Sequence, residues 1–169
     1  GTAVAMASAR AADANANANW PTRTVRLVVP YAAGGFADTR ARLIAEQLGK
    51  TLGQPVIVEN RGGAGGVSGT DVVAKATDGH TFGFASPGPL VTNPILMKKV
   101  PYDARTAFKP IILIEQAPLF LTTAPNQPFK TLQEFLAYAK ANPGKLTYGS
   151  SGVGGAHHLS GELLAYQTK

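Results

Sequence analysis

Residues 24–59 read TVRLVVPYAAGGFADTRARLIAEQLGKTLGQPVIVE, and this stretch decides the fold. The β-branched run at 24–29 predicts a strand, and residues 55–59 predict a second one. Between them, residues 38–49 carry apolar side chains at helical spacing, and the glycines at 49 and 53 predict where that helix ends. A strand, a glycine loop, a helix and a strand in this order favour an α/β fold with a parallel sheet covered on both faces.

The same alternation continues downstream. Residues 68–76 predict a second helix with Ser68 as its N-cap, residues 80–85 a third strand, and residues 90–97 a short helix. His80 begins that strand and is interpreted as a surface or capped residue. These elements would complete a first lobe.

A second lobe is expected after a connecting segment. Apolar runs at 111–115 and 119–123 predict one strand or a pair of strands. The Ser/Thr-x-x-Glu pattern at 131–134 is a capping box that predicts a helix. A strand at 146–148 and a final helix at 157–167 follow. The inward residues of the capped helix are expected to be Leu132, Phe135, Leu136 and Ala139.

Composition and motifs exclude several function classes. The chain has no cysteine, and its 16 Lys and Arg against 10 Asp and Glu are scattered, which argues against a nucleic-acid partner. Neither G-x-G-x-x-G nor G-x-S-x-G occurs, and Ile44 stands where a P-loop needs its first glycine. His157 and His158 are adjacent, so they cannot chelate a metal as an i, i+4 pair does. The sequence therefore predicts no catalytic site, no metal site and no cofactor.

The first 19 residues differ from the rest of the chain. They are built mainly of Ala, Asn, Ser and Gly, with small-x-small sites at 7–9 and 9–11. This pattern is typical of the end of a signal peptide followed by a polar spacer, with an artificial leader or a frayed Ala-rich helix as the alternative. No apolar stretch approaches the ~18 residues that a membrane span needs. We therefore expect a protein located outside the cytoplasm, and the family resemblance given below implies the periplasm.

Three predicted strand-to-helix loops are rich in Gly or Ser, at 33–38, 85–88 and 149–155. In open α/β sheets ligands bind at this edge, beyond the carboxyl ends of the strands. Glycine lets backbone N–H groups approach a ligand, and the first four N–H groups of a helix have no internal partner. A carboxylate would accept hydrogen bonds there and gain from the helix dipole. Asp38, in the first turn of a predicted helix, is interpreted as a cap more readily than as a ligand contact.

Residues 28–66 resemble the substrate-binding receptors of tripartite tricarboxylate transporters, the Bug family. The resemblance continues through motifs such as DVVAKA at 71–76 and LTYGSSG at 146–152 and covers nearly the whole chain after the leader. It implies a periplasmic-binding-protein type II-like fold with two α/β lobes hinged around a cleft. Lobe 1 is then expected at 20–104, and an incomplete lobe 2 at 105–169, because the family is longer than this chain.

The resemblance also implies a carboxylate gripped by two loops, one from each lobe. Two departures bear on the ligand: Ala33 replaces a usual proline, and Phe36 fills a small-residue position, which suggests an unusual or aromatic acid. The second loop lacks a hydroxyl that the family commonly places there. The candidate ligand-binding residues are Tyr31, Ala33, Gly34, Gly35, Phe36, Asp38, Ser86, Ser150, Ser151, Gly154, Gly155, Ala156 and His157.

The expected function is that of an extracytoplasmic solute receptor, not an enzyme. Its ligand would be a di- or tricarboxylate, an amino acid or an aromatic acid, delivered to membrane transporter subunits. A chain with an incomplete lobe is also expected to self-associate or to need its remainder. A ligand-sensing receptor for a signalling system would use the same site. An enzyme acting on a small anionic metabolite is the less favoured alternative, with His157, His158 or Asp38 as its acid or base.

Overall fold

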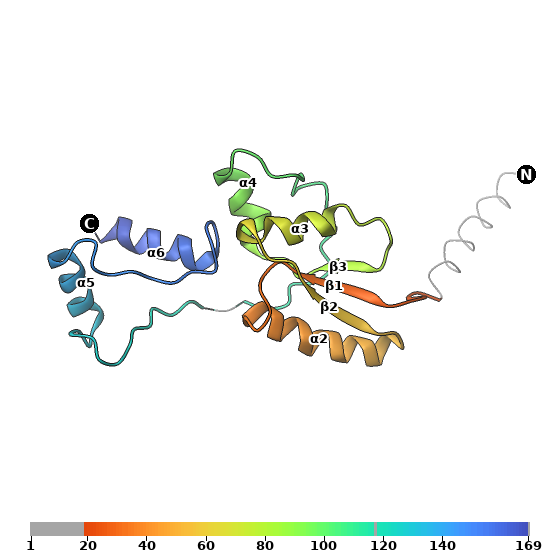
Figure 1. The fold of residues 1–169 in the computed structure, drawn as a ribbon, viewed down its shortest axis with the longest axis horizontal. Helices are drawn as coiled ribbons and strands as arrows, with labels where there is room; N and C mark the ends of the chain where they lie inside the picture. Colours follow the sequence, from red (N-terminus) through yellow and green to blue (C-terminus); the bar gives the residue numbers. More distant parts are fainter. Residues whose placement is uncertain (1–18, 117, 169) are drawn as a thin grey trace, which may run out of the picture. The chain divides into compact units, whose positions relative to one another are not determined.

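The computed structural model describes residues 19–116 and 118–168, so the predicted leader lies outside the described residues except for its last position. Helices and strands alternate over the first half, as predicted (Figure 1). In chain order the elements are β1 (Val25–Val29), α2 (Phe36–Leu52), β2 (Val56–Asn60), η1 (Ala64–Gly66), α3 (Val67–Ala74), β3 (Thr81–Gly83), η2 (Gly88–Thr92), α4 (Asn93–Leu96), α5 (Leu132–Ala141) and α6 (Ala156–Gln167).

The three strands form a parallel sheet in the order β2-β1-β3. The register of β1 with β2 runs from Val25↔Val56 to Val29↔Asn60, and β1 pairs with β3 on its other side. As the central strand, β1 is buried at every position except Arg26. A β-branched, apolar strand of this kind is what a sheet buried on both faces requires. The predicted α/β fold with a parallel sheet is confirmed.

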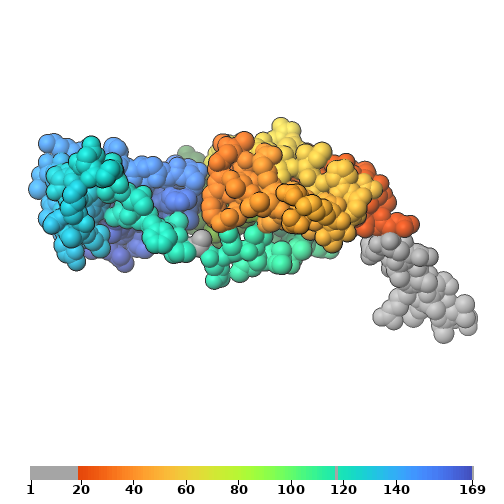
Figure 2. All heavy atoms as spheres, turned by 90° about the horizontal axis from the view of Figure 1, so that it is seen from below, coloured from red at the N-terminus to blue at the C-terminus, as the bar shows by residue number. Residues whose placement is uncertain are grey.

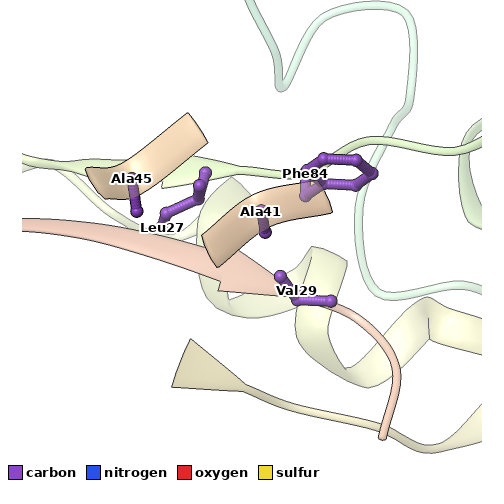
Figure 3. Packing of buried hydrophobic residues seen from close by; sticks show 5 residues of the cluster. All are labelled: Leu27, Val29, Ala41, Ala45 and Phe84. Carbon is purple, nitrogen blue, oxygen red and sulfur yellow. The ribbon is translucent and has the colours of Figure 1, made fainter. Parts of the chain in front are cut away.

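Helix α2 covers one face of the sheet. Figure 3 shows Leu27 and Val29 of β1 packed against Ala41 and Ala45 of α2, with Phe84 beside them. The two alanines are almost fully buried, and their small side chains let the helix axis come close to the strands. In Figure 2 the atoms of α2, in orange, form part of the surface turned toward the viewer.

Helix α3 covers the opposite face (Figure 1). A Cβ placed on Gly69 would lie 2.5 Å from the Arg61 carbonyl oxygen and 2.7 Å from the Pro30 Cα, so α3 rests directly on the backbone. Next to β3, a Cβ on Gly83 would lie 3.0 Å from a methyl carbon of Val73. Both faces of the sheet are therefore covered, as the sequence predicted.

The first described residues are tied to the turn that precedes β3. The Trp20 indole N–H donates to the Gly79 carbonyl at 3.0 Å, and the Thr22 N–H donates to His80 Nε2 at 3.2 Å. The His80 N–H is capped by Asp78 Oδ1 at 3.0 Å. His80 is buried, so its interpretation as a surface residue is wrong, whereas its interpretation as a capped residue is confirmed.

The described chain forms two compact units. One contains the residues up to Gly63 together with Ser68–Phe84, and the other contains Ala64–Val67 together with the residues from Ala85 onward. The predicted lobe boundary between residues 104 and 105 stays a prediction.

Several predicted helix ends were wrong. Helix α2 begins at Phe36, two residues before its predicted start, and passes residue 49. It ends at Leu52, which confirms the end signal predicted at Gly53: this residue adopts a left-handed conformation (φ 66°) and donates its N–H to the Gly49 carbonyl. Helix α3 begins at Val67, one residue before its predicted cap. Ser68 is not the cap, because the 3-10 turn η1 leads directly into α3 and the Ser68 N–H donates to the Gly63 carbonyl. Strand β3 covers only Thr81–Gly83.

The strands predicted at 111–115, 119–123 and 146–148 do not form within the described residues. The first two runs are extended but exposed: Ile112 is 78% and Phe120 is 80% exposed. Apolar, β-branched residues favour a strand only when a neighbouring strand accepts their backbone hydrogen bonds. The described part of the chain supplies no such neighbour here.

Helix α5 confirms its capping box and most of its predicted inward face, because Phe135, Leu136 and Ala139 are half-buried. Glu134 N–H donates to Thr131 Oγ1 at 3.2 Å, and Thr131 N–H donates to Glu134 Oε2 at 3.3 Å. Leu132, however, is exposed. Phe129, which precedes the helix, is buried against the rings of Phe135 and Tyr138.

Candidate functional site

The first candidate loop connects β1 to α2. Gly34 has φ 81°, a left-handed conformation that glycine adopts at little cost. Gly35 is the N-cap of α2, with φ −81° and ψ 175°, and no side chain caps the helix from this position. The N–H groups of the first helical turn therefore have no side-chain cap, which is the condition the sequence predicted for an anion site.

Asp38 holds this loop in place from inside. It is 3% exposed, and its Oδ2 accepts the Gly34 N–H at 2.8 Å and the Arg42 Nε–H at 3.0 Å. Its Oδ1 lies 3.0 Å from Arg42 Nη2 as an ion pair, without the geometry of a hydrogen bond. The hydrogen bond from Arg42, followed by that from Gly34, lowers the Asp38 pKa to about 2. These contacts support the interpretation of Asp38 as a cap.

The other candidates of the first loop differ in exposure. Ala33, Gly34, Gly35 and Phe36 are exposed, whereas Tyr31 is half-buried against the core. Phe36 is 60% exposed, and the Arg40 guanidinium lies over its ring at 5.0 Å from the centroid. An aromatic face and a cation therefore lie beside the uncapped turn.

Sequence reasoning missed Asn60 at the end of β2. Its amide Nδ2 donates to the Tyr31 carbonyl at 3.2 Å, and its Oδ1 accepts from Arg42 Nη2 at 3.2 Å. Asn60 thus connects the end of β2 to the first loop through the Tyr31 carbonyl and to α2 through Arg42. Its position at the carboxyl end of a predicted strand was the available signal.

The second candidate loop leads into α6. Gly152 and Gly154 have φ 117° and 78°, and Gly155 is the N-cap of α6, again with no side-chain cap. The Gly155 N–H donates to the Gly152 carbonyl at 3.1 Å, which folds the loop into a turn. The helix begins at Ala156, one residue before its predicted start at residue 157.

Side chains of the second loop bond within the loop. Ser151 Oγ and His157 Nδ1 lie 3.1 Å apart, and Ser150 Oγ accepts the Gly152 N–H at 3.4 Å. The Gly154 N–H donates to His158 Nδ1 at 3.3 Å. The structure thus brings Ser150, Ser151 and His157 together. Ser86 is half-buried in the segment between β3 and η2. That the two loops and Ser86 share one ligand stays a prediction.

Helix α5 has a side-chain cap at its N-terminus, which helices α2 and α6 lack. Its N-terminus is closed by the reciprocal capping box of Thr131 and Glu134. Helices α2 and α6 both start at a glycine without a side-chain acceptor. Each of these two turns keeps backbone donors and the positive end of a helix dipole for an external anion.

Sequence reasoning also missed Asn93, a fully buried asparagine next to the second loop. Nothing in the local pattern of residues 90–97 distinguishes it from an ordinary helix residue.

Among residues 19–116 and 118–168, no three His, Asp or Glu side chains gather as metal ligands would. No helix described there is long and apolar enough to cross a bilayer.

Comparisons with known proteins place this chain beside one family of receptors. Residues 40–168 match the model of the tripartite tricarboxylate transporter family receptor. The chain is 40% identical over 147 residues to the UPF0065 protein in the tcbD-tcbE intergenic region of Pseudomonas sp. (strain P51), covering 86% of this chain and 44% of that protein. It is 38% identical to protein BugT of Bordetella pertussis, covering 88% of this chain and 46% of BugT.

Two solved structures are also similar. The structure of R. palustris Rpa4515 with adipate matches with a TM-score of 0.85 and 39% identity, over 88% of this chain and 50% of that one. The structure of MatC from Rhodopseudomonas palustris with bound malate matches with a TM-score of 0.81 and 37% identity, over 88% of this chain and 51% of that one. The chain spans about half the length of the relatives it matches.

Proposed function

Because this chain belongs to the tripartite tricarboxylate transporter receptor family, we propose that it binds a small carboxylate outside the cytoplasm and presents it to a membrane transporter. The observation that carries the proposal is the pair of uncapped, glycine-started helices, α2 and α6. Each belongs to a different compact unit, which is the arrangement expected of a two-lobed receptor.

The chemistry of these turns suits a carboxylate. A carboxylate oxygen is a charged acceptor, and hydrogen bonds to charged acceptors are stronger than those between neutral groups. Neutral donors at a helix N-terminus satisfy the anion without a cationic side chain, and the dipole adds to the attraction. The net charge of +6 supplies a weak general field of the same sign.

The two similar structures that carry ligands support a dicarboxylate. Adipate and malate each have two carboxylate groups, and both structures are over 35% identical to this chain. The exposed Phe36 ring, with Arg40 stacked on it, adds an apolar contact and a cation beside the first turn. We therefore favour a dicarboxylate or an aromatic acid over an amino acid, whose ammonium group would meet the positive end of a dipole.

Titration calorimetry tests the proposal. The purified protein, including any sequence its gene encodes beyond these residues, is titrated with adipate, with malate and with dimethyl adipate, which has the same chain without the charges. We expect heat of binding from at least one acid and none from the ester. If the ester binds as tightly as the acids, or if no carboxylate in a broader panel of di- and tricarboxylates and aromatic acids binds, the proposal is wrong.

A further inference from the structure

Asn93, the first residue of α4, is a buried polar side chain that the function described so far does not use. It is fully buried, and its Nδ2 donates to the Gly65 carbonyl at 3.1 Å. Its Oδ1 has no hydrogen-bond partner within the described part of the chain. A buried acceptor left without a donor is costly, so a structural or functional reason for its presence is expected.

Gly154 lies directly against this oxygen. A Cβ added to Gly154 would fall 1.9 Å from Asn93 Oδ1 and 3.0 Å from Asn93 Cγ. The Gly154 φ of 78° disfavours any other residue independently of that contact. Since Gly155 is the N-cap of α6, the Asn93 amide touches the residue immediately before the uncapped helix turn.

Gly65 contacts the nitrogen end of the Asn93 amide. Its φ is 62°, and a Cβ there would lie 2.6 Å from the Val153 carbonyl oxygen and 2.8 Å from Asn93 Nδ2. A Cβ on Gly152 would lie 3.5 Å from the Gly65 Cα. The Asn93 amide is therefore held between two glycine backbones that belong, like Asn93, to the second compact unit.

We propose that Asn93 is the positioning residue of the second loop: its amide, fixed by the Gly65 carbonyl and pressed against Gly154, sets the direction of the N–H groups that open α6. The inference rests on the proposed function, because it assigns those N–H groups to the carboxylate. A flat amide that is hydrogen-bonded at its nitrogen and in contact with Gly154 at its oxygen leaves the Gly154–Gly155 peptide little freedom to tilt. Preorganised donors bind an anion more tightly than donors that must first be ordered.

Two matched pairs of variants isolate this role. Asn93→Ala removes the amide, and Asn142→Ala is its control, because Asn142 Nδ2 makes a similar bond of 3.0 Å to the Tyr138 carbonyl at the end of α5. Gly154→Ala adds a methyl group against the amide. Its control is Gly144→Ala, where φ is 76° and a Cβ would meet nothing within 4 Å.

Each variant is studied in two measurements. The first is hydrogen exchange of the amides of residues 154 and 155 in the ligand-free protein, because both residues are buried and their N–H groups donate to His158 Nδ1 and to the Gly152 carbonyl. The second is the affinity for adipate or malate, whichever the unaltered protein binds. We expect Asn93→Ala and Gly154→Ala to speed the exchange and to weaken binding about tenfold or more, the equivalent of about one hydrogen bond to a charged group. Because both changes disrupt one contact and Gly154→Ala also carries the cost of its positive φ, the double variant should bind little worse than Gly154→Ala alone. The two controls should change neither measurement.

The results separate the inference from the function on which it rests. Unchanged exchange at residues 154 and 155 in Asn93→Ala overturns the positioning role, and so does an affinity within about twofold of the unaltered protein. If Asn93→Ala does not fold, Gly154→Ala decides by the same criteria. If the unaltered protein binds no carboxylate, the proposed function fails, and the ligand-free exchange still decides whether Asn93 holds the loop.

Discussion

Replacing the N-cap of α2 with an acid should block the proposed carboxylate site from within the protein. The perturbation is Gly35→Asp, and the matched control is Gly35→Ala. Gly35 has φ −81°, which any L-residue adopts, and a Cβ there would lie 3.6 Å from the Ala32 carbonyl oxygen, an ordinary contact. Both substitutions should therefore leave the fold intact.

The aspartate variant should be more stable than the alanine variant and should bind the ligand more weakly. An N-cap aspartate accepts the N–H groups of the first turn and stabilises a helix by about 0.5–2 kcal/mol relative to alanine, part of which repulsion from Asp38 offsets here. The ligand would lose at least one hydrogen bond to a charged group, worth about 1.5–3 kcal/mol, or roughly 10- to 150-fold in affinity. Alanine supplies no acceptor and should bind within about threefold of the unaltered protein.

Urea unfolding and titration calorimetry with adipate or malate measure the two effects on the same preparations. The expected pattern is that the aspartate variant is the more stable of the two and the weaker binder. An aspartate variant that binds as tightly as the unaltered protein would refute the assignment of the α2 N-terminus to the ligand. So would an alanine variant that loses as much affinity as the aspartate variant, because the effect would then come from the added carbon and not from the acceptor.

Three further predictions concern the scaffold. Thr131→Val should lower the free energy of unfolding by about 1 kcal/mol in urea denaturation, because it removes the α5 cap, whereas Thr131→Ser should keep most of it. Gly69→Ala should lower it by about 1–3 kcal/mol, because the new methyl group would overlap the Arg61 carbonyl, whereas Gly149→Ala, with open space around it, should change the urea midpoint little. The folded-state pKa of Asp38, about 2, lies below its usual 3.8, so its contribution to stability is complete above pH 3.8 and is lost as the pH falls through 2. Asp38→Asn should remove this contribution from the profile of urea midpoint against pH between pH 5 and about 2. If the variant and the unaltered protein gave profiles of the same shape, the role of Asp38 would be contradicted.

The sequence predicted the first unit well because local pattern and tertiary environment agree there. The apolar run of β1 is a central strand, and the helical spacing after it matches the core contacts of Ala41 and Ala45. The capping box at Thr131 was equally predictable, since both of its partners lie within four residues of each other. Signals of this kind depend on neighbours in the chain.

The failures occurred where structure depends on distant partners. Residues 111–115 have the composition of a strand, yet a strand forms only where another strand pairs with it. Leu132 fits the inward face of α5 but is exposed, whereas Phe129, from outside the helix, packs on Phe135 of that face. Asn93 had no local signal at all, because its contacts come from residues 28 and 61 positions away in the chain.

The 19 glycines show the same limit in another way, because composition counts them alike while the structure separates their roles. Gly34 and Gly144 have positive φ and open space around them, so glycine is favoured there by the backbone conformation and not by close packing. Gly69 has no positive φ but lies against rigid backbone, so it serves close packing. Gly65 and Gly154 combine both constraints: each has a positive φ, and a Cβ on either would overlap the buried amide of Asn93. A side chain is therefore excluded at both positions for two independent reasons. That combination indicates that the loop before α6 is a constrained turn and not a flexible connection, as the positioning role proposed for Asn93 requires.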